Sequence, residues 1–378
     1  MMRSLVLLIA LSTVLLLTGC EVPESEPNGD PSPPEEAPAV EEDTEATPAA
    51  EDDSEGLRIT MIDVGQGDAV LLESPEGQTV LYDGGPARGN VLDQLRGLEV
   101  EAIDLVIASH PHEDHIGGLT SVIEAYEPRL VIDSGMPHTT RAYDRYLDAI
   151  EAAGSQLLDN PERQPIEFGP ATLELVPPPQ DDDLGLNDNS VGFILTYGDF
   201  QASFYGDAEH DQFEWLLEHH SDLFPDVQVH KASHHASRNG DVREAIEQLR
   251  PEVVIAGIGQ DNRYGHPHDE ALLLYEAVGA DFYSTDRHGS IQIDAYTSGR
   301  FEIDTALDAE ALAEARCVNI NQAAPDELER LTNVGASTAE GIVATRPFGS
   351  IADLERVSGL AESTVTEIKD QGLACVEE

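Results

Sequence analysis

The hexapeptide HPHEDH, residues 110–115, decides how this chain is interpreted. Its H-x-H-x-D-H pattern places four side chains that can bind a metal ion within six residues. An apolar run at residues 103–108 predicts a buried strand before it, and Gly117 and Gly118 follow it. The array therefore lies on a loop that leaves a strand, where side chains can converge on a metal ion. A histidine-rich surface loop is the alternative, and the downstream sequence argues against it.

Further residues of the same types follow other predicted strands. Asp207 comes directly after the apolar run 202–205, where a carboxylate can bridge two metal ions. The others are Asp63, Asp83, His234, His235 and His266. So many aspartates and histidines at strand ends predict a single site along one edge of a sheet structure.

Two strand-rich blocks organise the middle of the chain. The first has predicted strands at residues 57–64, 69–73 and 79–82. The second begins near Thr172 and includes strands 191–197 and 201–205, followed by a helix at 209–220. Two such blocks with helical stretches between them predict two packed sheets with helices outside. A linker of helical character, residues 305–316, then leads to a helical end.

The N-terminal residues predict an exported protein. Residues 1–20 carry Arg3 and then an apolar stretch that is short for a membrane span, as in a secretory signal. Their end at Cys20 resembles a lipobox, which implies cleavage before Cys20 and lipidation of its thiol; an uncleaved signal anchor is the alternative. Residues 21–55 then contain fourteen Asp or Glu and no Lys or Arg, which predicts a disordered acidic tether at 21–56.

The composition is extremely acidic, with a net charge of −54 and a pI near 4.2. Lys231 and Lys369 are the only lysines among 20 basic residues. High salt screens the self-repulsion of such a chain, so the composition is typical of proteins from halophiles. Outside the cell, Cys317 and Cys375 are expected to form a disulfide, with two buried thiols as the alternative.

With these stretches in place, residues 57–304 resemble the metallo-β-lactamase superfamily, and within it the extracellular hydrolase domain of ComEC-type competence proteins. The resemblance rests on residues 63–68, 83–85, 109–118, 206–209, 231–237 and 264–267. It implies an α/β fold, an αββα sandwich, with two divalent metal ions, zinc or manganese. The ligands that it implies are His110 and His112 for one metal, Asp114 and His115 for the other, Asp207 as the bridge, and His234 or His235 as a further ligand of the second metal. Asp114 and His266 are the expected catalytic residues, with His266 at the mouth of the pocket.

The chain departs from the superfamily pattern at two places. Many members have another histidine before the bridging aspartate, but here His138 comes too early and the corresponding stretch, residues 187–190, reads NDNS. The first metal is therefore expected to be short of ligands. Ala236 stands where this branch usually has glycine. Lys231 could contact a phosphate, but a salt bridge at a strand end is the preferred interpretation.

The last residues, 315–378, resemble the tandem helix-hairpin-helix unit of ComEA-type DNA receptors. Two turns, residues 331–339 and 357–364, repeat one arrangement, with Asn333 and Ala361 in place of two usual glycines. The resemblance implies an all-α domain whose turns present backbone amides to phosphate oxygens of double-stranded DNA without sequence preference. The expected contacts are Val334, Gly335, Ser337, Gly359 and Ala361. A helical protein-binding or capping module is the alternative.

These patterns predict a lipid-anchored, metal-dependent phosphodiesterase on the extracellular face of the membrane, most simply a nuclease acting on DNA. The expected parts are a signal peptide (1–20), a tether (21–56), a hydrolase domain (57–304), a linker (305–314) and a helix-hairpin-helix domain (315–378). A DNA-uptake channel is a further candidate partner. The alternatives are a phosphoesterase of small esters such as phosphocholine and a non-catalytic DNA receptor.

Overall fold

The computed structural model describes residues 56–260, 262–307, 318–371 and 373–376. The predicted signal segment with Cys20, the acidic tether up to residue 55 and Cys317 lie outside the described residues. In the described part of the chain, no helix combines the length and the apolar character that crossing a membrane requires.

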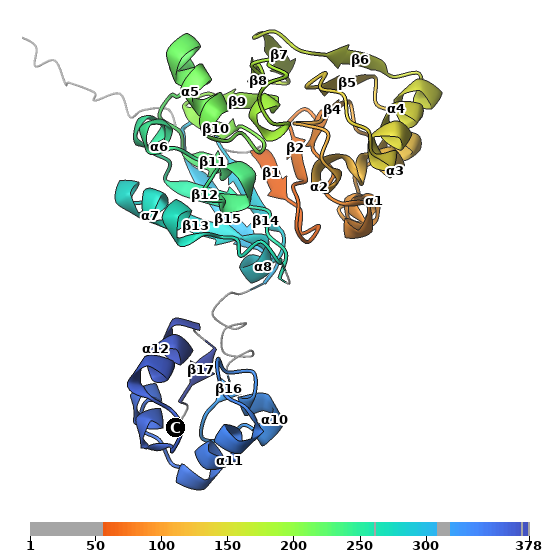
Figure 1. Cartoon of the computed structure of the whole chain (residues 1–378). Coiled ribbons are helices and arrows are strands. Elements are labelled where there is room, and N and C mark those ends of the chain that lie inside the picture. The colour runs from red at the N-terminus through yellow and green to blue at the C-terminus, as the bar shows by residue number, and fades with distance from the viewer. Residues whose placement is uncertain (1–55, 261, 308–317, 372, 377–378) are drawn as a thin grey trace, which may run out of the picture. The chain divides into compact units, whose positions relative to one another are not determined.

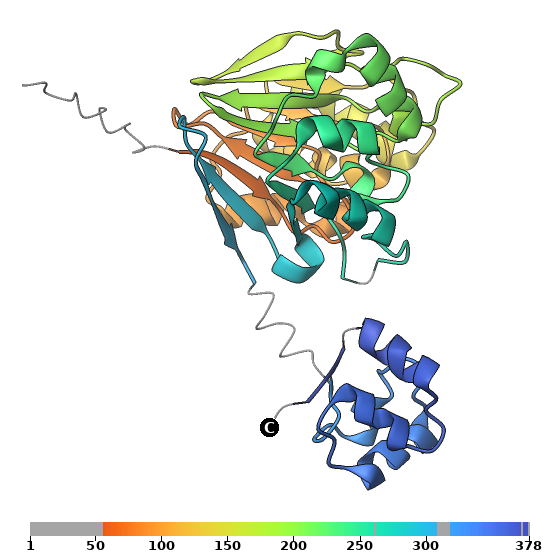
Figure 2. The same cartoon turned by 90° about the vertical axis from the view of Figure 1, so that its left-hand side faces the viewer.

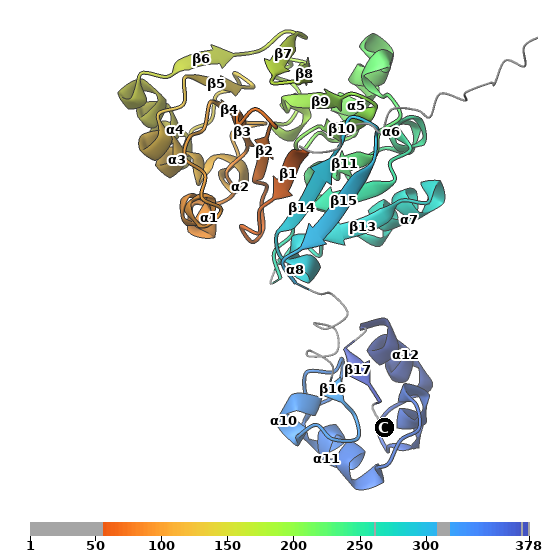
Figure 3. The same ribbon diagram turned by 180° about the vertical axis from the view of Figure 1, so that it is seen from behind.

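The first sheet has eight strands in the order β15-β14-β1-β2-β3-β4-β5-β6. Its first three strands along the chain form antiparallel hairpins, and β3 to β6 are parallel. Strand β14 comes from far along the chain and pairs antiparallel with β1, so that Leu57 lies opposite Ala295 (Figure 3). The strands are β1 (Leu57–Met61), β2 (Val70–Glu73), β3 (Thr79–Tyr82), β4 (Leu105–Ile107), β5 (Leu130–Asp133), β6 (Gln156–Asp159), β14 (Ile291–Ala295) and β15 (Phe301–Thr305).

The second sheet has seven strands in the order β13-β12-β11-β10-β9-β8-β7. Strands β7 to β10 are antiparallel, and β10 to β13 are parallel. The strands are β7 (Pro165–Phe168), β8 (Ala171–Val176), β9 (Gly192–Tyr197), β10 (Phe200–Phe204), β11 (Val229–Lys231), β12 (Val253–Ala256) and β13 (Asp281–Ser284).

Three apolar layers hold the sandwich together. Side chains from the facing sides of the two sheets form the central layer, in which the rings of Phe193 and Phe204 stack with centroids 4.5 Å apart. Helices α1, α3 and α4 cover the outer face of the first sheet, and α5, α6 and α7 cover the second (Figures 1 and 2). The predicted αββα architecture is therefore confirmed. The helices are η1 (Ala87–Gly89), α1 (Val91–Gly97), α2 (Glu113–Ile116), α3 (Leu119–Tyr126), α4 (Arg141–Ala153), η2 (Asn187–Asn189), α5 (His210–His219), η3 (Ser221–Leu223), η4 (Ser233–Ala236), α6 (Arg243–Leu249), α7 (Asp269–Val278) and α8 (Thr285–His288).

The tail has an apolar core of its own residues, which includes Leu328, Ile342, Leu354 and Ile368. Its elements are β16 (Val318–Asn319), α10 (Pro325–Leu328), α11 (Ala336–Thr345), η5 (Ile351–Arg356), α12 (Glu362–Gln371) and β17 (Ala374–Cys375).

Three expectations need correction. The tail is not purely helical, because β16 and β17 pair in parallel and bring its two ends together. Thr305 is not part of a linker, because it is the last residue of β15 and pairs with Ile291. The second sheet does not begin near Thr172, since β7 precedes it from Pro165.

Cys375 is disulfide-bonded, and its expected partner Cys317 lies outside the described residues.

Candidate metal centre

The H-x-H-x-D-H array lies where β4 ends, as the sequence predicted. The loop after Ile107 carries His110 and His112, and the short helix α2 carries Asp114 and His115. Backbone segments pack closely behind this loop, because a Cβ atom at Gly118 would lie 2.2 Å from the carbonyl oxygen of Gly84. The glycine that follows the array is therefore required by the approach of the β3 turn to α2.

Four imidazole rings converge on one oxygen of Asp207, which follows β10. The Nε2 atoms of His115 and His235 lie 3.1 and 3.5 Å from Asp207 Oδ2. Those of His234 and His110 lie 3.9 and 4.0 Å from the same oxygen. Residues from both sheets thus meet at a single buried carboxylate.

The first pair of histidines is also close together. His110 Nε2 lies 2.8 Å from His112 Nδ1, and the two rings meet edge to face. His110 is buried, and its other ring nitrogen lies 3.0 Å from the hydroxyl of Ser109. His110 Nε2 thus lies between His112 Nδ1 and Asp207 Oδ2, close to both of them.

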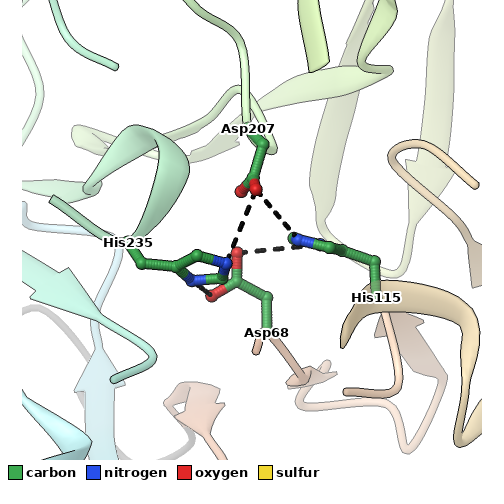
Figure 4. A group of neighbouring side chains, drawn as sticks. All are labelled: Asp68, His115, Asp207 and His235. Carbon is green, nitrogen blue, oxygen red and sulfur yellow. Dashed lines mark hydrogen bonds and ion pairs between the residues drawn. The ribbon is translucent and has the colours of Figure 1, made fainter. Parts of the chain in front are cut away.

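Carboxylates stand behind two of these rings. His115 Nδ1 lies 2.8 Å from Asp83 Oδ2, and Asp83 accepts hydrogen bonds of 2.7 Å from both the amide and the hydroxyl of Ser109. His235 Nδ1 lies 3.3 Å from Asp68 Oδ1 (Figure 4). A carboxylate on the far nitrogen orients a metal-binding histidine and raises its basicity.

The charges in the site divide into two groups. Burial lowers the pKa of His110 and of His112, and the neighbouring His115 lowers both further. Although burial opposes it, Asp207 and Asp83 raise the pKa of His115 well above its usual value, and Asp207 and Asp68 raise that of His235 to about 10. These imidazolium charges in turn hold the pKa of Asp207 well below its usual value despite burial. The positive charges of His115 and His235 thus balance the buried carboxylates, as a bound cation would.

The donor atoms fit divalent metal ions. Ligand atoms of Asp68, His115, Asp207 and His235 all lie within 4.8 Å of one another. His235 Nε2 and Asp207 Oδ1 are buried without a hydrogen bond. Buried polar atoms normally have partners, so these atoms lack what a metal ion would supply. Imidazole nitrogen with carboxylate oxygen suits zinc or manganese.

Residues 62–258 match the model of the metallo-beta-lactamase superfamily. The chain belongs to this superfamily. A second match, to the helix-hairpin-helix motif, covers residues 313–371.

The chain is similar to several curated proteins over different shares of its length. ComE operon protein 3 of Bacillus subtilis (strain 168) is 26% identical over 256 residues, which are 62% of this chain and 32% of that protein. Recombination protein 2 of Haemophilus influenzae is 22% identical over 271 residues, 70% of this chain and 32% of that protein. A deoxyribonuclease of a Thioalkalivibrio strain is 37% identical over 81 residues, 20% of this chain and 22% of that protein. The chain therefore matches a third or less of the length of these relatives.

Among solved structures, the metallo-beta-lactamase fold protein YhfI of Bacillus subtilis is 14% identical to this chain, with a TM-score of 0.40. The match covers 60% of this chain and 95% of that one.

The turn after β11 carries the two histidines whose roles the sequence left open. His234, His235 and Ala236 all have φ between 48° and 58°, a left-handed conformation that costs a non-glycine residue about 1–2 kcal/mol. His235 is almost completely buried and belongs to the compact group of ligand atoms, whereas the side chain of His234 is 22% exposed, with its Nδ1 2.9 Å from Glu209. The placement favours His235 as the superfamily ligand.

Strained turns of this kind need support from their surroundings. The amide of Ser233 donates to Asp241 Oδ2 at 3.1 Å, and the Ser233 hydroxyl donates to the Ala208 carbonyl at 2.7 Å. Asp241 is fixed in turn by Tyr275, whose hydroxyl donates at 2.6 Å, and by His230, whose Nε2 lies 3.1 Å away. Ala236 is therefore tolerated where this branch usually has glycine.

His138 lines the pocket of the superfamily site, although it comes early in the sequence. It lines a pocket of about 370 Å³ together with His112, Asp114, Asn187, Asp207 and His266, and its ring centroid lies 5.9 Å from that of His112. It reaches the pocket because β5 pairs with β4, so the loop after β5 opens beside the loop that carries the metal-binding array. Asn187 lies in the same pocket and its Oδ1 is buried without a hydrogen bond.

His266 occupies the pocket as expected. Burial, with His235 and His234 nearby, lowers its pKa to about 4, and its Nδ1 makes no hydrogen bond. Asp114 also lines the pocket, with Oδ2 3.6 Å from His235 Nε2. A neutral imidazole and a carboxylate thus border the position of the expected metals.

Lys231 does not face the pocket. Its ammonium group is completely buried, contacts Asp68, and donates a hydrogen bond of 2.8 Å to the carbonyl of Gly206. The salt-bridge interpretation of Lys231 is therefore confirmed. Because Asp68 also contacts His235, this lysine supports the metal centre from behind rather than binding substrate.

The two tail hairpins repeat one conformation. Asn333 and Gly359, at matching positions, have φ of 58° and 102°, and the next residues, Val334 and Leu360, are both buried. Helix α11 begins directly after Gly335 and α12 directly after Ala361. The first amides of a helix have no partner within it, so both hairpins present free donors of the kind that contact phosphate. Asn333 replaces glycine because asparagine tolerates the left-handed conformation.

Sequence reasoning left several site residues without a role. Asp68 and Asp83 stood in the stretches that carried the resemblance, but neither was assigned a function. Their signal was a carboxylate at a strand end, the feature that identified Asp207. His138 and Asn187 carried no comparable signal.

Proposed function

We propose that this protein is a two-metal phosphodiesterase that hydrolyses DNA. The observation that carries the proposal is the convergence of four imidazole Nε2 atoms, at 3.1–4.0 Å, on Asp207 Oδ2 beside the close His110–His112 pair. Such an arrangement has room for two cations that share one carboxylate.

The proposed ligands divide between the two metals. His110 and His112 hold the first, and Asp114, His115 and His235 hold the second, with Asp207 between them. When bound, two such metals lower the pKa of a water molecule and neutralise charge on a phosphodiester.

The chain's own residues position the substrate. His266 is neutral at pH 7 because its pKa is lowered to about 4, so it can donate a hydrogen bond to a phosphate oxygen without carrying charge. Asp83 and Asp68 hold the rings of His115 and His235 in place. The buried walls around Asp207 exclude bulk water and strengthen these interactions.

DNA is the proposed substrate because the same chain carries a helix-hairpin-helix match, and relatives include competence proteins and a deoxyribonuclease. Of the proposed tail contacts, Gly335, Ser337, Gly359 and Ala361 would bind duplex DNA through backbone amides. The amide of Val334 already donates to the carbonyl of Leu331 at 3.0 Å, so Val334 is not proposed as a donor. A site of this kind depends less on salt than one built on lysines, since fewer side-chain cations release counterions. Gly359→Pro should break the second hairpin and so abolish duplex binding. The affinity of the unchanged protein for duplex DNA should fall only shallowly as the salt concentration rises.

Anchoring through a lipid on Cys20, and a DNA-uptake channel as partner, are part of the same proposal. Cys20→Ser should release the protein from membranes or leave an unprocessed precursor. If Cys20→Ser fractionates and migrates like the unchanged protein, the lipid anchor is wrong.

The function is tested by incubating the purified protein with duplex and single-stranded DNA, bis(p-nitrophenyl) phosphate and p-nitrophenyl phosphocholine. Mn²⁺ or Zn²⁺ is supplied at multimolar salt. DNA cleavage that stops in Asp207→Asn is the expected result. Cleavage of the small esters alone would indicate a small-ester phosphoesterase, and DNA binding without any hydrolysis would indicate a receptor.

A further inference from the structure

We propose that the cavity next to the metal centre is a nucleotide-binding subsite for a single DNA strand. This inference rests on the proposed phosphodiesterase function and names the form of substrate that the site takes. The cavity has a volume of about 720 Å³, within the usual range of about 300–1,000 Å³ for small-molecule sites. The residues of its lining that matter here are Gln66, Arg88, Asp114, Asn262, Arg263 and Tyr264.

The cavity and the metal pocket are continuous. Gln66, Glu113, Asp114 and Tyr264 line both, and the smaller pocket contains His112, Asp207 and His266. A strand whose scissile phosphate lies at Asp207 therefore extends past Asp114 into the larger cavity.

Hydrogen bonds hold the walls of this cavity in place. The amide of Gly259 donates to Gln66 Oε1 at 3.2 Å, which joins the loop after β12 to the loop after β1. Asn262 Nδ2 donates to the carbonyl of His266 at 2.9 Å, and the His266 amide donates to Asn262 Oδ1 at 2.9 Å. The loop that carries Arg263 and Tyr264 is thus tied to the metal pocket at both ends.

Two arginines at the cavity are not paired with a carboxylate. Arg88 and Arg263 are exposed, and neither forms an ion pair or hydrogen bond with the described part of the chain. Of the thirteen arginines at residues 57–304, Arg129, Arg141, Arg145 and Arg287 are likewise unpaired in the described part of the chain, but they do not line this cavity. The other seven pair with carboxylates; they are Arg58, Arg96, Arg163, Arg238, Arg243, Arg250 and Arg300. In a chain with 74 acidic and 20 basic residues, unpaired guanidinium groups beside a catalytic pocket are suited to bidentate contacts with phosphate.

The carboxylates that share the cavity are already engaged. Asp63 Oδ1 accepts a hydrogen bond of 3.1 Å from the amide of Gly65. Glu113 Oε1 accepts one of 3.1 Å from the amide of Ala87. Asp114, the third, is a proposed metal ligand. Their charges are therefore partly compensated where the phosphate chain would pass.

Tyr264 supplies a surface for a base. Its side chain is 58% exposed, although it is a large aromatic residue, and its ring stacks on His266 with centroids 5.7 Å apart at 24°. A base can stack on this ring only if it has left a double helix, and aromatic stacking accepts any base. The subsite therefore selects single-stranded or unpaired DNA without sequence preference, whereas the tail is proposed to bind duplex.

The test compares Tyr264→Ala and the double variant Arg88→Gln/Arg263→Gln with the unchanged full-length protein. The substrates are a 5′-fluorescent single-stranded oligonucleotide and bis(p-nitrophenyl) phosphate. For each variant, the ratio of kcat/KM for the oligonucleotide to that for the small diester should fall about tenfold, mainly through KM. In the double variant, the slope of log KM against log salt should also fall by about 1.4, since each phosphate contact to a single strand contributes about 0.7.

Tyr264→Phe keeps the ring and should restore the ratio, which separates stacking from displacement of His266. Arg243→Gln, which removes an exposed ion pair with Glu247, is the matched control and should leave the ratio unchanged.

Three results would overturn the inference or locate the failure elsewhere. If both substrates are hydrolysed and the ratio is the same in all variants, the cavity is not a nucleotide subsite, although the phosphodiesterase stands. If the unchanged protein hydrolyses neither substrate, the proposed function fails. In that case the subsite is tested by the fluorescence anisotropy of a labelled thymidine oligonucleotide of five nucleotides. Equal affinity in all variants would exclude the nucleotide subsite, and weaker binding by both Tyr264→Ala and Arg88→Gln/Arg263→Gln would support it.

Discussion

The two halves of the metal centre receive different support from the protein around them. His115 and His235 each have a carboxylate behind the ring, Asp83 at 2.8 Å and Asp68 at 3.3 Å, and both have a raised pKa. His110 and His112 have lowered pKa values, and a serine hydroxyl rather than a carboxylate lies behind His110. The half supported by carboxylates should therefore bind its metal more tightly.

Asp207 is the residue that both halves share, so its loss should have the largest effect. We expect Asp207→Ala to lose most of both metals and to reduce hydrolysis below detection. Metal content measured by elemental analysis, together with phosphodiester hydrolysis, checks this. Full metal content with full activity in Asp207→Ala would show that the two halves do not depend on a shared carboxylate.

Asp83→Asn should weaken metal binding at the His115 half by about 10–100-fold, the usual effect of removing a carboxylate that orients a ligand histidine. The affinity is measured by competition with a chromophoric chelator. Asp104→Asn is a suitable control, because Asp104 also accepts a hydrogen bond at a strand end, from the Thr79 amide, but at the opposite end of β4 from the array. Equal affinity in Asp83→Asn and Asp104→Asn would remove the proposed asymmetry.

The half with His110 and His112 should release its metal first. During stepwise titration with a chelator, we expect one equivalent to leave at a chelator strength about tenfold lower than the other. His138→Ala should lower this weaker affinity further, by a few fold, if the ring beside His112 contributes to the site. Simultaneous release of both metals, or an unchanged weak step in His138→Ala, would contradict this ordering.

The last prediction concerns folding stability and not metal binding, at Asp133, which ends β5 on the side of the array. Burial raises its pKa to about 6 from 3.8, against a hydrogen bond from the amide of Gly135. Between these two pH values the folded chain holds more protons than the unfolded chain, so the contribution to stability is present below about pH 4 and is lost as pH rises to 6. Asp133→Asn should therefore be more stable than wild type at pH 7, by up to about 3 kcal/mol, and the difference should vanish near pH 4.

Chemical unfolding of both chains at matched salt and at several pH values measures this difference, and comparing two chains cancels the titration of the other acids. A constant difference across pH would show that folding does not raise the pKa of Asp133.

The sequence alone was sufficient to identify what depends on local patterns. The array at residues 110–115, the carboxylate after β10 and the histidine pair after β11 each follow a short apolar strand, so their presence at a sheet edge could be predicted from strand periodicity. The tail hairpins were predictable for the same reason, because each turn and its two helices are contiguous in sequence.

The tertiary structure decided which of these residues meet and what stands behind them. Strand β5 pairs beside β4 and so brings His138 to His112. Strand β11 pairs beside β10, and its Lys231 meets Asp68 from the loop between β1 and β2 of the other sheet, which also contacts His235. The pairing of β14 with β1 joins residues more than 200 positions apart. Side chains on one strand alternate by a local rule, but the order of strands in a sheet is set by long-range packing of apolar faces, and no short stretch of sequence contains that information.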